Sequence, residues 1–322
     1  MLHPNYIKMA PMAGLAGLGG GALNLAYKSA GAAAATTWYG DRAVVFGGTP
    51  TGSFYNNIAY YDITSTGNAT DFGDTTQARG YAPACGSGTL AAYGGGISIN
   101  TIDYVTVSTT GNAQDWGDLT TGGSGAGANS SLERGLWGGG FGRTGTIDYI
   151  TWASVANAVD FGDLAQSLAN TRAASNGTRC AWFGGEIPGG AKQNIWQYVT
   201  MDSTGNATDA ADLNSGAKTN MGACGNADRA IVFGGDDGGR INNIQYVDIS
   251  TTNNTSDFGD LTSARNTIAG ANNATRATAN GGWDSWTTNK IEHVTIDSTG
   301  NASDFGDLTT SPSSPGAASG AA

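Results

Sequence analysis

One phrase, repeated six times, constrains this chain more than any other feature of its sequence. In its clearest copy, residues 102–119, a β-branched and aromatic run leads through Thr-Gly-Asn-Ala to Asp-Trp-Gly-Asp. Each copy has two ring positions separated by twelve residues, although one copy has alanine at the second position. The pairs are Tyr60 and Phe72, Tyr104 and Trp116, Tyr149 and Phe161, Tyr198 and Ala210, Tyr246 and Phe258, and His293 and Phe305. Self-similarity at this period indicates propeller blades or solenoid turns.

A double glycine that closes an apolar run precedes every copy, and it defines six units of 44 to 50 residues. Its second glycine is Gly48, Gly95, Gly139, Gly185, Gly235 and Gly282. Glycine lets neighbouring backbones approach where a β-carbon would hold them apart. We interpret the glycines and the paired rings as structural repeat positions, with the rings packing between units.

Each unit predicts four antiparallel strands. Runs such as 43–46 and 230–233 are apolar at consecutive positions, so both faces of these strands must be buried. The run 244–249 has the composition of a strand, and Thr-Gly-Asn-Ala is typical of a tight turn. No amphipathic helical stripe is present. Blades stacked around an axis bury both faces, which favours an all-β, six-bladed propeller over a two-layer sandwich.

The expected organisation has three parts. A glycine-rich N-terminal arm, residues 1–29, contacts other subunits of an assembly, residues 30–310 form the propeller, and residues 311–322 form a tail. The expected blades span residues 30–76, 77–120, 121–165, 166–213, 214–262 and 263–310. Two segments compete to supply the innermost strand of the first blade. Residues 30–38 are preferred because they lead directly into the strand at Arg42, and residues 315–322 are the alternative.

The repeat resembles the kelch repeat over about residues 30–310. A double glycine, then a tyrosine, then an aromatic residue near Leu-Thr-x-Ala-Arg, as in residues 261–265, carry this resemblance. The order Ile-Asp-Tyr-Val-Thr, Thr-Gly-Asn-Ala-x-Asp-Phe-Gly-Asp-Leu-Thr also resembles kelch-like virion proteins of tailed bacteriophages, especially those of marine bacteria. The resemblances imply a propeller in a tail fibre, an appendage or a head decoration. Ala210, Asn280 and His293 depart from the pattern, so the fourth and sixth blades are the least regular.

Composition argues against several classes of function. The chain has a net charge of −11 and a pI of about 4.4, and its basic residues are scattered singly. This argues against nucleic acid or an anionic membrane surface as a partner. The charged fraction of only 13% suits a rigid extracellular β-protein. No run is long and apolar enough to span a membrane, and the glycines and proline of residues 9–21 make a poor signal peptide.

The three cysteines, Cys85, Cys180 and Cys224, are expected as buried thiols. Cys85 and Cys224 occupy matching Ala-Cys-Gly contexts in the second and fifth units, which lie across the axis of a six-fold ring. That separation exceeds the span of a disulfide. The fold therefore needs no oxidising compartment.

Catalytic chemistry is sparse, and we expect a non-enzymatic protein without cofactor or metal. A kelch-like copper oxidase needs paired imidazoles near a tyrosine, but the chain has only His3 and His293. Neither an Asp-box nor the arginine triad of six-bladed sialidases is visible. The Asp-Phe-Gly-Asp carboxylates recur in nearly every unit, so we interpret them as turn caps and not as calcium ligands. Asp236 and Asp237 are not repeated, and they leave open a weak cation site.

Candidate binding residues lie in the variable loops after the double glycines, because function tends to reside in what departs from a rigid scaffold. They are Phe54, Tyr55, Asp236, Asp237, Arg240, Trp283, Asp284 and Trp286. These loops join the same pair of strands in every unit, so we expect them on one face. Aromatic rings beside Asp and Arg suit stacking on a host surface glycan. They equally suit gaps between blades or contacts to another virion subunit.

The expected function is that of a virion structural protein with a surface- or receptor-binding role, assembled in the host cytoplasm and present in many copies. Other virion proteins, reached through the N-terminal arm, are its expected partners. A polysaccharide-active enzyme acting through the loop face and a bacterial surface adhesion module are the alternatives. Convergent acidic residues in a deep pocket would favour the enzyme.

Overall fold

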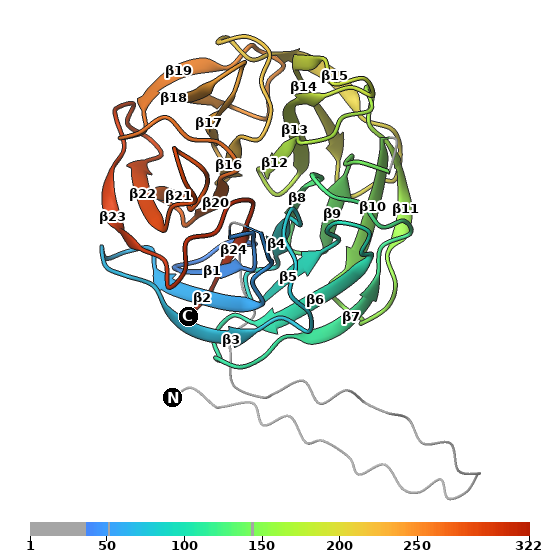
Figure 1. Ribbon diagram of the computed structural model, residues 1–322. Coiled ribbons are helices and arrows are strands. Elements are labelled where there is room, and N and C mark those ends of the chain that lie inside the picture. Colours follow the sequence, from blue (N-terminus) through green and yellow to red (C-terminus); the bar gives the residue numbers. More distant parts are fainter. Residues whose placement is uncertain (1–36, 51, 143–144) are drawn as a thin grey trace, which may run out of the picture. The chain divides into compact units, whose positions relative to one another are not determined.

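Each repeat forms one four-stranded antiparallel sheet, as its apolar runs and glycine-containing turns predict (Figure 1). The computed structural model describes residues 37–50, 52–142 and 145–322. These residues form twenty-four strands and no helix. The six sheets surround a central axis, so the predicted all-β, six-bladed propeller is confirmed. The predicted arm, residues 1–29, lies outside the described residues.

The strands of each blade are given from the innermost to the outermost. Blade 1 contains β24 (Gly316–Gly320), β1 (Arg42–Phe46), β2 (Asn57–Asp62) and β3 (Thr70–Asp74). Blade 2 contains β4 (Ala84–Gly86), β5 (Leu90–Gly94), β6 (Thr101–Thr106) and β7 (Gln114–Asp118). Blade 3 contains β8 (Gly127–Ser130), β9 (Arg134–Gly138), β10 (Thr146–Thr151) and β11 (Val159–Asp163). Blade 4 contains β12 (Arg172–Ser175), β13 (Arg179–Glu186), β14 (Lys192–Thr200) and β15 (Thr208–Asp212). Blade 5 contains β16 (Gly222–Gly225), β17 (Ala230–Asp236), β18 (Arg240–Val247) and β19 (Ser256–Asp260). Blade 6 contains β20 (Ala269–Asn272), β21 (Arg276–Asn280), β22 (Lys290–Thr295) and β23 (Ser303–Asp307).

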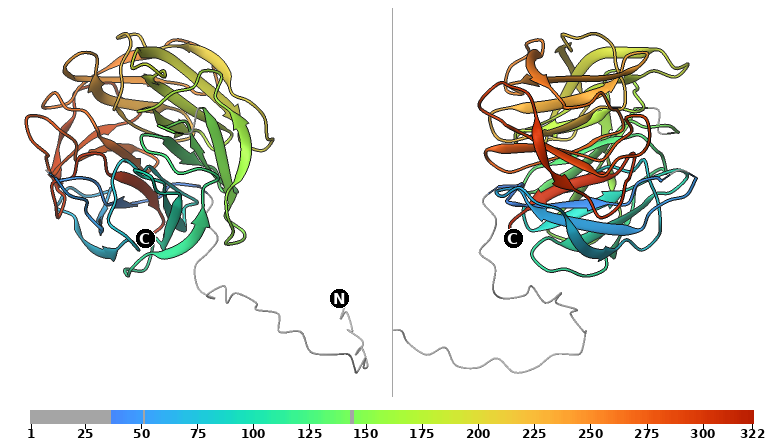
Figure 2. Two further views of the ribbon diagram at one scale, coloured as in Figure 1. Left: turned by 45° about the vertical axis from the view of Figure 1, so that its right-hand side comes forward. Right: turned by 60° about the vertical axis from the view of Figure 1, so that its left-hand side comes forward.

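The six innermost strands form a closed ring around the axis. β4 contacts β8, and the contacts continue through β12, β16, β20 and β24 back to β4. β24 is the innermost strand of blade 1 and pairs with β1 from Gly320 opposite Arg42 to Gly316 opposite Phe46. Figure 2 shows this strand, in red, beside the blue strands of blade 1. The preferred prediction that residues 30–38 close the ring is therefore wrong. The C-terminal alternative is confirmed, and the expected tail is part of the propeller.

Small side chains explain why the C-terminal segment closes the ring. An added β-carbon on Gly316 would lie 2.7 Å from the Tyr93 ring, and one on Gly320 would lie 2.5 Å from the Gly88 carbonyl oxygen. Such close approaches leave no room for larger residues. Trp38, from the other end of the described chain, instead lies against Gly177 in the turn between β12 and β13.

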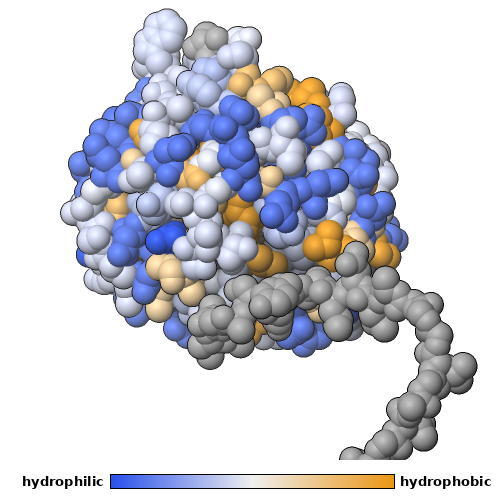
Figure 3. Space-filling view, turned by 90° about the horizontal axis from the view of Figure 1, so that it is seen from below, coloured by the Kyte–Doolittle hydropathy of each residue, from blue (hydrophilic) through white to orange (hydrophobic). Residues whose placement is uncertain are grey.

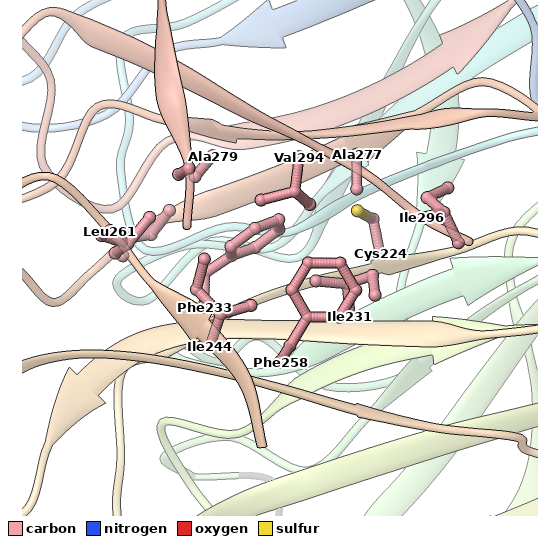
Figure 4. Close-up of a cluster of buried hydrophobic side chains, with 12 residues drawn as sticks. Cys224, Ile231, Phe233, Ile244, Phe258, Leu261, Ala277, Ala279, Val294 and Ile296 are labelled. Atoms are coloured by element: carbon pink, nitrogen blue, oxygen red, sulfur yellow. The ribbon is translucent and has the colours of Figure 1, made fainter. Parts of the chain in front are cut away.

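Hydrophobic clusters fill the spaces between neighbouring blades. Each of six clusters combines side chains of two adjacent blades. Between blades 5 and 6, Phe258 and Ile244 pack with Val294 and Ala277 (Figure 4). Within a blade the paired rings meet edge-on, as Tyr246 and Phe258 do with their centroids 5.8 Å apart. The predicted packing of the repeated rings between blades is confirmed.

A set of hydrogen bonds, here called the inter-blade clasp, joins the outermost strand of each blade to the next blade. Between blades 1 and 2, the backbone N–H of Asp74 donates to Asn112 Oδ1 at 3.0 Å. The N–H of Ala113 donates to the Asp74 carbonyl oxygen at 2.8 Å. The asparagines that accept the equivalent bond at the other five boundaries are Asn68, Asn157, Asn206, Asn254 and Asn301. The Thr-Gly-Asn-Ala phrase is thus both a turn between two strands and a connector between blades.

The glycine of Asp-Phe-Gly-Asp makes the inter-blade clasp possible. Gly73 has a φ of +148°, and a β-carbon added to it would lie 2.4 Å from the Gly111 carbonyl oxygen. The first aspartate of the phrase accepts a backbone hydrogen bond as predicted in blade 2, where Gly117 N–H donates to Asp115 Oδ1 at 3.0 Å, but both residues lie inside β7 at a register shift, so the aspartate does not end the strand. The last aspartate of the phrase forms the inter-blade clasp through its backbone N–H and carbonyl groups.

An arginine at the start of the second strand adds a contact between blades that was not anticipated from the sequence. The Arg42 guanidinium lies 4.8 Å from the centroid of the Tyr60 ring, a cation–π distance. Its Nη1 donates to the Val107 carbonyl oxygen of blade 2 at 3.1 Å. Arginines that make the equivalent bond to the following blade are Arg134, Arg179, Arg229 and Arg276.

The double glycine lies one residue later in blades 2 and 3 than predicted. Both blades have three successive glycines, and the two whose φ angles match those of Gly47 and Gly48 are residues 95–96 and 139–140. Their N–H groups also make the same bonds, since Gly47 donates to Asn57 O and Gly95 to Thr101 O. Positive φ at both positions explains why each blade has glycine there.

Trp196 compensates for the missing ring of blade 4. It is fully buried, and its cluster also packs against Ala210, which replaces the second ring of the repeat. Its Nε1 donates to the Asn253 carbonyl oxygen of blade 5 at 3.0 Å. Trp182 belongs instead to the cluster between blades 3 and 4, and its Nε1 donates to Gly127 O at 3.0 Å. Of the two tryptophans predicted to fill this volume, Trp196 does so.

We expect Trp196→Ala to destabilise the protein more than Ile102→Ala at the matching position of blade 2. Removal of a buried tryptophan costs about 3–5 kcal/mol, and here it also leaves Asn253 without a donor. Ile102 lies in a cluster that retains Trp116, so the space left by its side chain is partly filled and the loss of stability is smaller. Denaturation midpoints of the two variants give the comparison. An equal or smaller loss for Trp196→Ala would mean that blade 4 is loosely packed.

The inter-blade clasp predicts a second difference between variants. Gly73→Ala should lower the free energy of unfolding by about 2–3 kcal/mol, because the new methyl group collides with the Gly111 carbonyl. Gly67→Ala is the matched control, since an added β-carbon there has nothing within 4 Å. Urea unfolding of both variants measures the effect. Similar stability for the two would show that the clasp can open without cost.

Candidate functional site

The loops that follow the double glycines and the loops that enter the innermost strands meet on one side of the ring, here called the loop face. A pit of about 570 Å³ opens there between blades 5, 6, 1 and 2. It is lined by Thr49, Pro50, Gly52, Ser53, Phe54, Tyr81, Ile97, Arg240, Asn266, Thr267, Trp283 and Ser313. Concave sites with aromatic walls and a few polar groups are the usual form of a ligand pocket.

The rim of the pit is built from one backbone position that recurs in the repeat. The residue directly after the double glycine pairs with the loop that enters an innermost strand, as Thr49 does with Ser313 and Trp283 with Asn266. Thr49 Oγ1 and Ser313 Oγ are also hydrogen-bonded at 2.6 Å. In the six blades this position holds Thr49, Ile97, Phe141, Glu186, Asp236 and Trp283. The backbone pairing recurs at five of these positions, all but Ile97, while the side-chain chemistry varies.

Residues with left-handed backbone form a second ring, just before the innermost strands. Their φ angles are 60° at Tyr81, 52° at Asn170, 56° at Asn220, 55° at Thr267 and 49° at Ser314, and glycine occupies the position in blade 3. Backbone N–H groups link neighbouring blades here, for example Thr267 N to Asn220 O at 2.6 Å and Ser314 N to Thr267 O at 2.9 Å. Such φ values are rare outside glycine, and strained residues cluster at functional sites. Tyr81 and Thr267 bring this ring into the pit.

Three of the eight predicted binding residues line the pit: Phe54, Arg240 and Trp283. Phe54 is 43% exposed. Arg240 also lines a neighbouring hollow of about 420 Å³ together with Asp284. Trp286 is 71% exposed and lines neither.

Tyr55 has a role in the scaffold. Its N–H donates to the Gly48 carbonyl oxygen at 2.9 Å, and its own carbonyl accepts from Arg79 N at 3.1 Å. It therefore fixes the loop that carries Phe54, and it is absent from the lining of the pit.

Asp236 is engaged by neighbours from two other blades. Its carboxylate pairs with Lys192 Nζ of blade 4 and accepts from Asn266 Nδ2 of blade 6 at 3.2 Å. The hydrogen bond from Lys192 holds the pKa of Asp236 below its usual value. The ammonium thus occupies the place that a cation would take, while Asp237 stays exposed. Across the described residues no three His, Cys, Asp or Glu side chains gather as a metal site, so nothing supports the weak cation site left open there.

Nine of the twelve residues that line the pit were not predicted as binding residues, and four of these are Tyr81, Ile97, Asn266 and Thr267. Ile97 follows the last of the three successive glycines of blade 2. Alignment of residues 95–96, and not 94–95, with Gly47 and Gly48 would have found it. The other three lie in loops that enter innermost strands, where no sequence pattern marks them.

Apolar and charged side chains are unevenly distributed over the loop face. Its exposed apolar side chains are Phe54, Ile97 and Phe141 in blades 1 to 3 and Trp286 in blade 6. Charged side chains, among them Lys192 and Arg240, gather in blades 4 to 6. The outer rim of the ring is mostly hydrophilic in the view of Figure 3.

Two buried ion pairs fasten the loops beneath the pit. Arg79 Nη2 lies 3.2 Å from Asp103 Oδ2, and Arg265 Nη2 lies 2.5 Å from Glu292 Oε2. Both arginines occupy the last position of Leu-Thr-x-Ala-Arg or its equivalent, and their carbonyls accept the N–H of the second glycine of the pair. All four side chains are at most 1% exposed. They fix the loops that join neighbouring blades and cannot reach a substrate.

Lys218 occupies the same position in the loop between blades 4 and 5, since its carbonyl accepts Gly185 N–H at 2.8 Å. The position equivalent to Asp103 and Glu292 holds Gln245 in blade 5 and not an acid. Among the described residues the buried Nζ of Lys218 has no hydrogen-bond partner. Burial lowers the pKa of Lys218 to about 8, against the smaller opposing effect of Asp237.

We expect Gln245→Glu to stabilise the protein. Between pH 8 and 10.5 the unfolded chain keeps the Lys218 proton and the folded chain loses it, so this contribution to stability rises with pH. A carboxylate at residue 245 raises the folded pKa, removes that slope and adds about 1–3 kcal/mol at pH 7. Thermal unfolding from pH 7 to 10 measures both effects. Gln197→Glu is the control, because its partner position holds Leu168, and we expect it to destabilise.

The three cysteines are buried and free, as predicted. Burial raises the pKa of Cys85, Cys180 and Cys224. They are therefore inert thiols at neutral pH. His293 takes the place of the repeat tyrosine, with its ring 5.5 Å from that of Phe305.

Comparison with known proteins leaves the fold as the main guide to function. No protein-family model matches this sequence, and a search of curated proteins found no match. In the described part of the chain no helix has the length and hydrophobicity needed to cross a membrane.

Proposed function

We propose that this protein is a non-enzymatic virion structural protein of a tailed bacteriophage, and that its loop face binds a saccharide of the host surface. The resemblance of the repeat phrase to kelch-like virion proteins supports the phage setting, in a tail fibre, an appendage or a head decoration. The observation that carries the binding role is the pit, where Phe54, Trp283 and Arg240 converge from three blades.

The chemistry of the pit suits a sugar. Aromatic faces such as those of Phe54 and Trp283 offer flat apolar surface for the C–H face of a pyranose ring. Arg240, Asn266 and Thr267 offer donors and acceptors for its hydroxyl groups. The rigid ring holds these side chains at fixed separations, which lowers the entropy cost of binding.

The lining also bears on the enzymatic alternative. Glycoside hydrolysis ordinarily uses two carboxylates that flank the scissile bond. None of the described residues that line the pit is acidic. The lining thus gives no support to a polysaccharide-active enzyme. Cleavage of an added polysaccharide by the purified protein would favour that alternative.

Binding should depend on the aromatic wall of the pit. A glycan array with the full chain identifies the saccharide, and calorimetry then compares variants. We expect Trp283→Ala to lower affinity at least tenfold, about 1.4 kcal/mol. Trp286→Ala removes an exposed tryptophan outside the pit and should leave affinity unchanged. Equal losses, or none, would remove the pit as the binding site.

The phage setting has its own test. Mass spectrometry of purified particles should detect this chain in many copies, and deletion of residues 1–29 should leave the propeller folded while abolishing its incorporation. A particle without the chain would end the virion proposal. Loss of folding on deletion would show that the arm serves the ring and not the assembly.

A further inference from the structure

One positively charged side chain lies at the propeller axis. Arg172 is in β12, the innermost strand of blade 4, where the other blades have small or cyclic residues. Its equivalents are Pro83, Gly127, Gly222, Ala269 and Gly316. The repeat therefore does not require a cation here, and its presence in one blade calls for a separate explanation.

Arg172 is half-buried and borders a cavity of about 30 Å³ that all six innermost strands line. The other lining side chains are small or neutral, among them Ala84, Ala128, Ala223 and Ala317. A volume of this size holds one or two species as small as water. Tyr81 lines both this cavity and the pit. Trp38 and Tyr39 line a further cavity of about 20 Å³ with residues of five of these strands, β12 excepted.

The charge of Arg172 is left without a counter-charge. Its Nη1 donates to the Thr171 carbonyl oxygen at 2.8 Å, and among the described residues the side chain forms no ion pair. Burial lowers the pKa of Arg172 to about 10. The buried Arg79 and Arg265 each have a carboxylate. A guanidinium has five N–H donors, so Arg172 retains donors beyond the one bound to Thr171, and no acidic residue lines the cavity that it borders.

We propose that Arg172 holds a small monovalent anion, a halide or a carboxylate, in the axial cavity. One cation balances one negative charge, whereas sulfate or phosphate would bring a second charge into apolar surroundings and exceed the volume. The anion is either free or the carboxylate of a ligand seated in the pit, since Tyr81 borders both spaces. This site does not depend on saccharide recognition by the pit.

Thermal unfolding of the full chain tests the proposal. Sodium bromide, formate and acetate are compared with sodium sulfate at matched ionic strength and pH, for wild type, Arg172→Gln and Arg172→Lys. At about 100 times the dissociation constant, the wild-type midpoint should rise by about 3–6 °C more than that of Arg172→Gln. Arg172→Lys should keep part of the rise. Lys290→Gln, which removes a charge from a side chain 40% exposed, should respond as wild type does.

Comparison of variants cancels the general effects of each salt on proteins. The same salt response in wild type and Arg172→Gln would overturn the proposal. If Arg172→Gln does not fold, bromide-soaked wild-type crystals decide the matter. An anomalous peak within hydrogen-bond distance of the guanidinium supports the site, and its absence refutes it.

Two further salts separate the sources of the anion. Stabilisation by galacturonate but not by methyl galactoside, with competition against bromide, places a ligand carboxylate at Arg172. Stabilisation by formate without any by galacturonate indicates a free ion. Both results support the site, and no stabilisation by any of these carboxylates or by bromide excludes it.

Discussion

The inter-blade clasp is the interaction on which the rest of this molecule depends. A single blade exposes apolar side chains on both faces, so it is stable only between two neighbours. The clasp fixes how those neighbours meet, because Asn112 and Ala113 of one blade hold both backbone groups of Asp74 in the other. The same bonds recur at every boundary, including that between blades 6 and 1, where Asn68 receives Asp307. A ring of backbone bonds near the axis does the same on the inside, so each blade is held at both its edges.

Much of this arrangement could be predicted from the sequence, because the repeat is a physical unit. The paired rings pack between blades, the double glycines adopt positive φ, and the Gly-Asn turn joins two strands. Each of these roles fits a radial fold. Ring closure could not be predicted in this way. Gly316–Gly320 contains only glycine, alanine and serine, which have little tendency to form strands, and residues 30–38 were preferred because they lead directly into the strand at Arg42. The place of Gly316–Gly320 in the ring is set by close approaches to Tyr93 and Gly88, which are distant in sequence.

The candidate site was predictable only in part, for a related reason. Phe54, Arg240 and Trp283 stand out because they interrupt a repeat. Tyr81 and Thr267 lie in the pit because six loops converge on the axis, a fact about the assembled ring and not about any one loop. Asp236 shows the opposite error, since it looked available in sequence yet is taken by Lys192 from the neighbouring blade. Sequence marks unusual residues, whereas geometry decides which of them are free.

Closure by the C-terminal strand has a consequence for the route by which the chain folds. Thr49 and Ser313, 264 positions apart, must meet before blade 1 is complete. Contacts between residues so distant in sequence have a large entropy cost of loop closure, and they tend to form late in folding. Until then β1 exposes an unpaired edge, of the kind on which strands of other chains can dock. The slow, concentration-sensitive step of folding therefore lies at the seam of blade 1, where the five small residues of β24 complete the ring.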